Sequence, residues 1–237
     1  STLTGASWLA ILKGHPKSGV EHMSSSTRLQ DTARELVTPK RGILAADEST
    51  PTIGKRFATI QVDSSADSRI AYRDGLFSTE GLSEFISGVI LYDETIRQRS
   101  KSGLPIPEAL SRAGILPGIK VDTGAKELAG HPGEKVTEGL DGLRERLVEY
   151  AEMGARFAKW RAVITIGDGI PSQTCIDGNA HALARYAARC IENQLVPIVG
   201  PGVMMVGAHS LETCDAVSHR ALVATFKALR AHATPLG

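Results

Sequence analysis

The sequence predicts an α/β fold, in which helices cover a parallel sheet, and three observations support this prediction. Apolar segments of strand length alternate along the chain with segments of helix length. The strand segments are apolar throughout, as strands buried on both faces are. Charged residues gather where these strands end, and β/α barrels build their active sites at that end. The pattern therefore favours a TIM-type (β/α)8 barrel, with a doubly wound open sheet as the alternative.

The expected elements follow one another as strand and helix. In chain order they are a helix over 27–37, a strand over 41–47, a loop over 49–55, a helix over 65–77, a strand over 86–92, a strand over 118–121, a helix over 139–153, a strand around Lys159, a helix over 179–193, a strand over 195–199 and a helix over 210–231. The loop is expected because Pro51 and Gly54 break regular structure. Only the first five strands of a barrel are found, so the domain over residues 23–237 is expected to be incomplete at its C-terminus.

Residues 1–22 differ from the rest of the chain. They contain a short apolar patch, Trp8–Leu12, between Gly5 and Gly14. The patch lacks the cationic start and the cleavage site of a secretory signal. We expect these residues to form an extension of unknown role.

The composition describes an ordinary globular protein. Hydrophobic residues make up 42% of the 237 residues, charged residues 22%, and the net charge is +1. The chain has no basic stripe, and its apolar runs are far shorter than the roughly 20 residues of a membrane span. We therefore expect neither nucleic acid nor a membrane as a partner.

The cysteines and histidines predict no cross-link and no metal site. Cys175, Cys190 and Cys214 are odd in number and widely spaced, so free buried thiols in a reducing cytosol are expected. No two histidines have the spacing of metal ligands along the chain.

The strand around Lys159 is the most informative segment. A strand repeats every two residues, so Phe157, Lys159 and Arg161 share one face. A second strand places Lys120 and Asp122 on one face in the same way. Cations in such apolar segments are costly unless an anion meets them. A structural ion pair at a strand end would explain one such segment, whereas two together favour an anion-binding site.

These residue types suit a phosphorylated substrate that carries a carbonyl group. Arginine offers a fixed fork to phosphate, and lysine acts as a mobile charge or as a nucleophile. A lysine beside another cation can form an imine with a carbonyl, and a carboxylate can then move the proton. From the residues alone, Lys159 is the candidate for the imine and Asp47 for the proton transfer.

Several long motifs resemble one family in the family's own order. They are Gly42–Thr50, Ile53–Arg56, Ser87–Leu91, Pro117–Asp122, Gly139–Leu143, Ala155–Arg161, Pro171–Ser172, Asn179, Leu183–Ala187 and Val196–Val199. They closely resemble class I fructose-bisphosphate aldolases over about residues 24–237. The resemblance implies a glycolytic lyase that cleaves fructose 1,6-bisphosphate through a lysine imine (a Schiff base), without a metal or cofactor. It also implies a cytoplasmic homo-oligomer, a tetramer in the family.

The resemblance assigns roles to particular residues. Asp47, Lys120 and Lys159 match the family's catalytic positions, and in this family Lys159 is a helper while the imine forms on a lysine of strand six. The matched substrate-binding residues are Thr52, Lys55, Arg56, Arg69 and Arg161.

Two departures from the family pattern bear on activity. The motif that carries the imine-forming lysine is not found among these residues, and Gly200-Pro201-Gly202 stands where the family has Glu-Pro-Glu. The first glutamate of that triplet is an acid/base group, and glycine has no proton to move. The chain is therefore expected to be a weak or inactive aldolase; the alternative is a catalytically dead scaffold that acts through binding.

Overall fold

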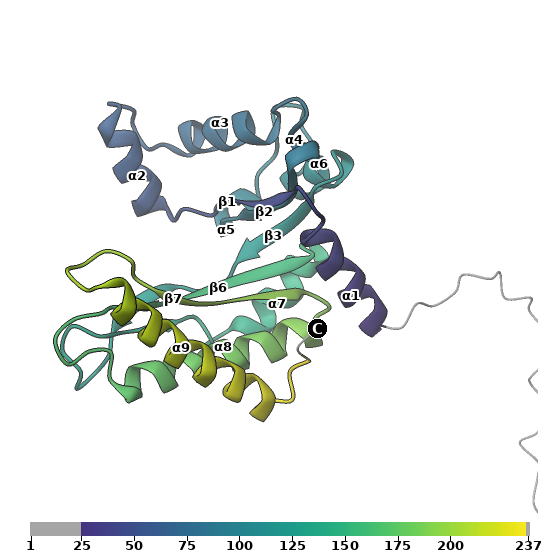
Figure 1. Cartoon of the computed structure of the whole chain (residues 1–237). Helices are drawn as coiled ribbons and strands as arrows, with labels where there is room; N and C mark the ends of the chain where they lie inside the picture. Colours follow the sequence, from purple (N-terminus) through teal and green to yellow (C-terminus); the bar gives the residue numbers. More distant parts are fainter. Residues whose placement is uncertain (1–24, 236–237) are drawn as a thin grey trace, which may run out of the picture.

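The structure, a computed structural model, describes residues 25–235. Its main sheet has five parallel strands in the order β1-β2-β3-β6-β7 and curls as part of a barrel wall (Figure 1). The strands are β1 (Gly42–Ala46), β2 (Ile86–Leu91), β3 (Leu116–Lys120), β6 (Phe157–Ile164) and β7 (Val196–Val203). The predicted class, an α/β fold with five strands of a TIM-type barrel, is confirmed.

The structure has nine helices in the described residues. They are α1 (Ser25–Leu36), α2 (Thr50–Thr59), α3 (Ala66–Phe77), α4 (Leu82–Phe85), α5 (Asp93–Ile96), α6 (Ile106–Arg112), α7 (Leu143–Glu152), α8 (Gln173–Glu192) and α9 (Leu211–Ala231). α1 precedes the first strand and packs at the inner base of the sheet, and the others follow the strands. α8 packs on β6 and β7, α9 packs on β7, and α7 packs on α8 (Figure 1). None of the helices in the described residues is long and apolar enough to cross a membrane.

The main core lies between the sheet and these helices. On β6 the fully buried side chains of Ala158, Trp160 and Ala162 point toward the helices. Trp160 stacks at a tilt on Tyr186 of α8, with 5.5 Å between the ring centroids. Since side chains alternate along a strand, Phe157, Lys159 and Arg161 must point to the inner side of the sheet.

A smaller apolar cluster fills the inner side at the amino-terminal ends of the strands. It joins Leu36 of α1 to Ile90, Leu116 and Phe157 of three strands. Phe157 lies over Gly118 of the neighbouring strand, where a Cβ would come within 2.2 Å of the ring. Only glycine leaves room for this ring, so the inner base of the sheet is closed by an aromatic side chain that needs Gly118.

The prediction of a polar loop over 49–55 is wrong, because these residues begin helix α2. Ser49 is its N-cap in an extended conformation, and Pro51 lies in the first turn. Proline is tolerated there, since its missing N–H would have no partner in the helix. Ile53 and Phe57, four residues apart, bury one face of the helix.

The first strand is less buried than the sequence indicates. The prediction of a buried strand over 41–47 is wrong for Gly42, Ile43 and Ala45, which are exposed. β1 is an edge strand among the described residues, so one of its sides has no neighbour in the sheet. The carboxylate that follows it, Asp47, is nevertheless buried, with 8% of its surface exposed.

Other element boundaries also differ from the expectation. α8 begins at Gln173 rather than at residue 179, and α7 begins at Leu143 rather than at residue 139. The sequence did not predict the short helices α4, α5 and α6, nor the antiparallel hairpin of β4 (Gly124–Glu127) and β5 (Lys135–Glu138). The extension predicted over residues 1–22 lies outside the described residues.

The three cysteines are free thiols, as predicted. Cys175 and Cys190 are buried as predicted, whereas the prediction of a buried thiol is wrong for Cys214, which is partly exposed. Burial raises the pKa of the Cys190 thiol, which keeps it protonated as a small core residue.

Candidate functional site

Two lysines lie side by side on the inner face, Lys120 as the last residue of β3 and Lys159 as the third residue of β6. Lys120 and Lys159 are direct partners in the pairing of these parallel strands. Their side chains are 19% and 22% exposed, so both amines lie in a partly buried place. Two ammonium groups held next to each other require anions nearby.

Each lysine has its own carboxylate. Lys159 Nζ donates a hydrogen bond to Asp47 Oδ2 at 2.8 Å. β2 and β3 lie between β1 and β6 in the sheet, so this contact crosses the concave interior. Lys120 Nζ bonds to the Asp122 carboxylate and, at 2.9 Å, to the Asp122 carbonyl oxygen. The curl of the sheet thus brings together residues that are 112 positions apart in the chain.

Asp122 fixes the geometry where β3 ends beside β6. Its Oδ1 accepts a hydrogen bond from the Gly124 N–H at 3.1 Å, and its Oδ2 accepts one from the Arg161 N–H at 3.2 Å. Thr137 of the β4–β5 hairpin donates to the Arg161 carbonyl oxygen at 3.0 Å. The backbone of Arg161 is therefore held on both of its polar groups.

The side chain of Arg161, in contrast, is exposed. The one hydrogen bond of its guanidinium to a described residue is a weak one to Met204 Sδ at 3.7 Å. Gly200 is its partner on β7, and a Cβ at Gly202 would lie 3.0 Å from Arg161 Nε. This glycine-rich end of β7 supplies no carboxylate to the guanidinium, which leaves its planar fork open to an anion. We refer to Asp47, Lys120, Asp122, Lys159 and Arg161 together as the inner rim.

The residues predicted to bind phosphate on α2 are largely exposed. Lys55 and Arg56 are both exposed, and Arg56 bonds to the Glu48 carboxylate. Thr52 Oγ1 lies 3.0 Å from Ser49 Oγ at the start of the helix. These three side chains lie in the first turns of α2, which follows Asp47 directly.

Arg69 is already engaged by a carboxylate. Its Nε donates to Glu94 Oε2 at 2.8 Å, and its Nη2 bonds to the other oxygen of the same group. This hydrogen bonding lowers the pKa of Glu94, against the opposing effect of burial, and raises the pKa of Arg69. A phosphate at Arg69 would compete with Glu94 for the fork. Its predicted role in phosphate binding stays a prediction.

Sequence reasoning missed Arg73, which connects the Arg69–Glu94 pair to the backbone beside the inner rim. Arg73 is fully buried; its Nη2 donates to the Glu48 carbonyl oxygen at 2.6 Å and its Nη1 to Glu94 Oε2 at 3.4 Å. Burial lowers its pKa, and the carboxylates of Glu48 and Glu94 act in the opposite direction. The spacing of Arg69 and Arg73, four residues apart on one helix, was the signal that could have identified it. Arg73 therefore anchors the backbone next to Asp47.

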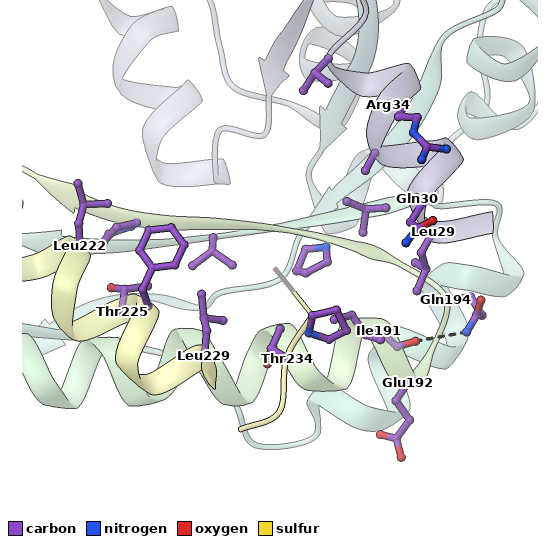
Figure 2. Close-up of a pocket in the computed structure, with 18 residues that line it drawn as sticks. Leu29, Gln30, Arg34, Ile191, Glu192, Gln194, Leu222, Thr225, Leu229 and Thr234 are labelled. Carbon is purple, nitrogen blue, oxygen red and sulfur yellow. Dashed lines mark hydrogen bonds between the residues drawn. The ribbon is translucent and has the colours of Figure 1, made fainter. Parts of the chain in front are cut away.

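A separate groove lies away from the inner rim. This groove of about 980 Å³ runs along β7 between α1 and α9, and Figure 2 shows Leu29, Leu222 and Leu229 among its lining side chains. Its walls are mostly apolar, whereas a phosphorylated ligand needs cations and hydrogen-bond donors. The inner rim is therefore the better candidate for a site that binds an anionic substrate.

Comparisons with known proteins agree on one family. A family model described as fructose-bisphosphate aldolase class-I matches residues 28–236. The chain is 58% identical over 205 residues to a probable fructose-bisphosphate aldolase class 1 of Xanthomonas axonopodis, with 86% of this chain and 61% of the relative covered. It is 55% identical over 200 residues to cytosolic fructose-bisphosphate aldolase 6 of Arabidopsis thaliana, with 84% and 56% covered.

A solved structure gives the same picture. The fructose-bisphosphate aldolase of Plasmodium falciparum matches with a TM-score of 0.86 and 47% identity, and 89% of this chain and 61% of that chain are covered. The chain thus spans 56–61% of the length of these three relatives.

Proposed function

The chain belongs to the class I fructose-bisphosphate aldolase family, and from that premise we propose that its inner rim binds fructose 1,6-bisphosphate. The observation that carries the proposal is the pair of lysines on the inner face, with Asp47 opposite them across the interior. A sugar bisphosphate supplies the anionic groups and the carbonyl that such a cluster can hold. The proposed reaction is reversible cleavage to glycerone phosphate and glyceraldehyde 3-phosphate.

Each rim residue has a proposed task. Lys120 and Lys159 hold the carbonyl and hydroxyl oxygens of the substrate as cationic donors. Asp47, bonded to Lys159 at 2.8 Å, accepts and returns the proton that moves when the C–C bond breaks. The open fork of Arg161 binds an oxygen-rich group, and Lys55, Arg56 and Arg69 surround one phosphate.

For the 237-residue chain, we propose that binding is retained while cleavage is weak or absent. The family's imine-forming lysine motif is not matched by these residues, and Gly200 replaces an acid/base glutamate. A Cβ at Gly200 would lie 3.0 Å from the Trp160 carbonyl oxygen, so a side chain would require a small shift of the neighbouring strand. The second candidate function, a dead scaffold that acts through binding, rests on the same two features.

Trapping of an imine tests this proposal. We expect that incubation with fructose 1,6-bisphosphate and sodium borohydride leaves the intact mass of the protein unchanged. The matched control is Lys159→Met, which removes the one rim lysine that pairs across the interior. A mass increase that is absent from the control would show an adduct on Lys159 and would contradict weak activity.

We also propose a cellular location and an oligomeric state. Relatives named as cytosolic aldolases of Arabidopsis thaliana support a cytoplasmic location. Half-exposed Leu222 and Phe226 on α9 support homo-oligomers, because such apolar surface favours association. A tetramer, as in the family, is the proposed form.

A further inference from the structure

Two histidines that are far apart in the sequence meet on the outer surface of the fold. His181 lies in the middle of α8, and His232 is the C-cap of α9. His232 Nε2 lies 3.3 Å from His181 Nδ1, and the ring centroids are 5.0 Å apart. Chain spacing predicted no metal site, because these residues are 51 positions apart and only the packing of α8 on α9 joins them.

The distance between the two nitrogens fits a shared metal ion. Zinc binds imidazole nitrogen at about 2.0–2.1 Å, and a tetrahedral angle then places two such nitrogens about 3.3–3.4 Å apart. The observed 3.3 Å therefore needs no movement of either helix. Because His181 is exposed and His232 is partly exposed, small rotations of the rings can direct both lone pairs at one ion.

The two ring nitrogens are within hydrogen-bond distance of each other, and a shared ion would take the place of that contact. Among the described residues neither ring forms an ion pair with a carboxylate, and His131 is the histidine that does. Asp177, one turn before His181 on α8, accepts a hydrogen bond from Gln173. The two rings thus contact each other, and no carboxylate of the described residues is paired with either ring.

We propose that His181 and His232 form a binding site for a divalent transition-metal ion such as Zn²⁺, Ni²⁺ or Cu²⁺. Imidazole suits these ions, whereas Mg²⁺ and Ca²⁺ prefer oxygen ligands. No group of three or more His, Cys, Asp or Glu side chains that could hold a metal occurs in the described part of the chain. Water completes the coordination, and the bound ion ties the end of α9 to the middle of α8. The site is independent of the proposed sugar site.

Thermal unfolding with Ni²⁺ tests the proposal on the full chain at about pH 8, where imidazole is a neutral ligand. At 100 times the dissociation constant, an ion that binds only the folded state raises the Tm by about 5–10 °C. We expect His181→Ala and His232→Ala each to abolish most of this rise. His219→Ala is the matched control, because His219 is an exposed histidine on α9 outside the pair.

The outcomes separate the site from other metal binding. A rise that persists in either His181→Ala or His232→Ala, a rise that is also lost in His219→Ala, or no rise in the unmodified protein overturns the proposal. Electron paramagnetic resonance of bound Cu²⁺ gives a second readout. We expect coupling to two nitrogens in the unmodified protein and to one in each single variant, and identical spectra would contradict the shared site.

Discussion

Two adjacent levels of the inner face of the sheet differ in what fills them. At the amino-terminal end, Leu36, Leu116 and Phe157 form a dry apolar base. One level closer to the carboxyl-terminal ends, Lys159 bonds to Asp47 across the interior and Lys120 bonds to Asp122, two residues after it. Phe157 and Lys159 are two residues apart on the same face of one strand. The first pleat of one strand therefore supplies a core residue and, two positions later, a residue of the candidate site, and substitutions should separate the two roles.

The largest effect is expected at the apolar base. Phe157→Ala removes a fully buried ring and leaves a cavity that Gly118 cannot fill, so the free energy of unfolding should fall by about 3–5 kcal/mol. Urea unfolding measures this change. Phe85→Ala is the control: Phe85 is 66% exposed on α4, and its loss should change the free energy of unfolding by less than about 0.5 kcal/mol. Equal costs in the two variants would contradict a packed inner base.

A smaller change in the free energy of unfolding is expected at Glu94, which bonds to Arg69 and Arg73 next to the inner rim. Glu94→Gln weakens the paired hydrogen bonds to Arg69 and leaves buried Arg73 less compensated, which should cost about 1–3 kcal/mol. Because the pKa of Glu94 is lowered in the folded state by its bonds to Arg69, the folded protein binds fewer protons than the unfolded chain. Its contribution is complete above the unfolded pKa, about 4.3, and is lost as the pH falls through the folded pKa.

Unfolding curves between pH 7 and pH 3 test the direction of this change in stability. The loss of stability on acidification should be smaller in Glu94→Gln than in the unmodified protein. Glu145→Gln is the control, because Glu145 is an exposed residue of α7. An unchanged pH dependence in Glu94→Gln would show that the Glu94 carboxylate is not stabilised by its arginine partners.

The sequence predicted the parts of the fold that depend on local pattern. Apolar runs located the five parallel strands, and alternation along β6 placed Lys159 and Arg161 on one face. Sequence reasoning failed where the structure depends on the place of a residue within a helix or of a strand within the sheet. Pro51 looked like a breaker because nothing local shows that it lies in the first turn of a helix. β1 looked buried because edge position is a property of the sheet, not of the strand.

The sequence predicted which residues form the candidate site but not which of them contact one another. Lys120 and Asp122 are close in the chain, so their contact follows from strand geometry. The contact of Lys159 with Asp47 spans 112 positions and exists because the sheet curls. Arg73 escaped notice because full burial of an arginine depends on partners from other elements.

The most direct test of the account is calorimetric titration with fructose 1,6-bisphosphate of the unmodified chain, Lys159→Met and Lys126→Met. Lys159 belongs to the inner rim, whereas Lys126 is an exposed lysine on the β4–β5 hairpin. Loss of one cationic contact to an anionic ligand should weaken binding about tenfold, or about 1.4 kcal/mol. Because the inner rim is proposed to bind the sugar bisphosphate, we expect this loss in Lys159→Met and an unchanged affinity in Lys126→Met. Equal affinities in all three proteins, or no binding by the unmodified chain, would contradict it.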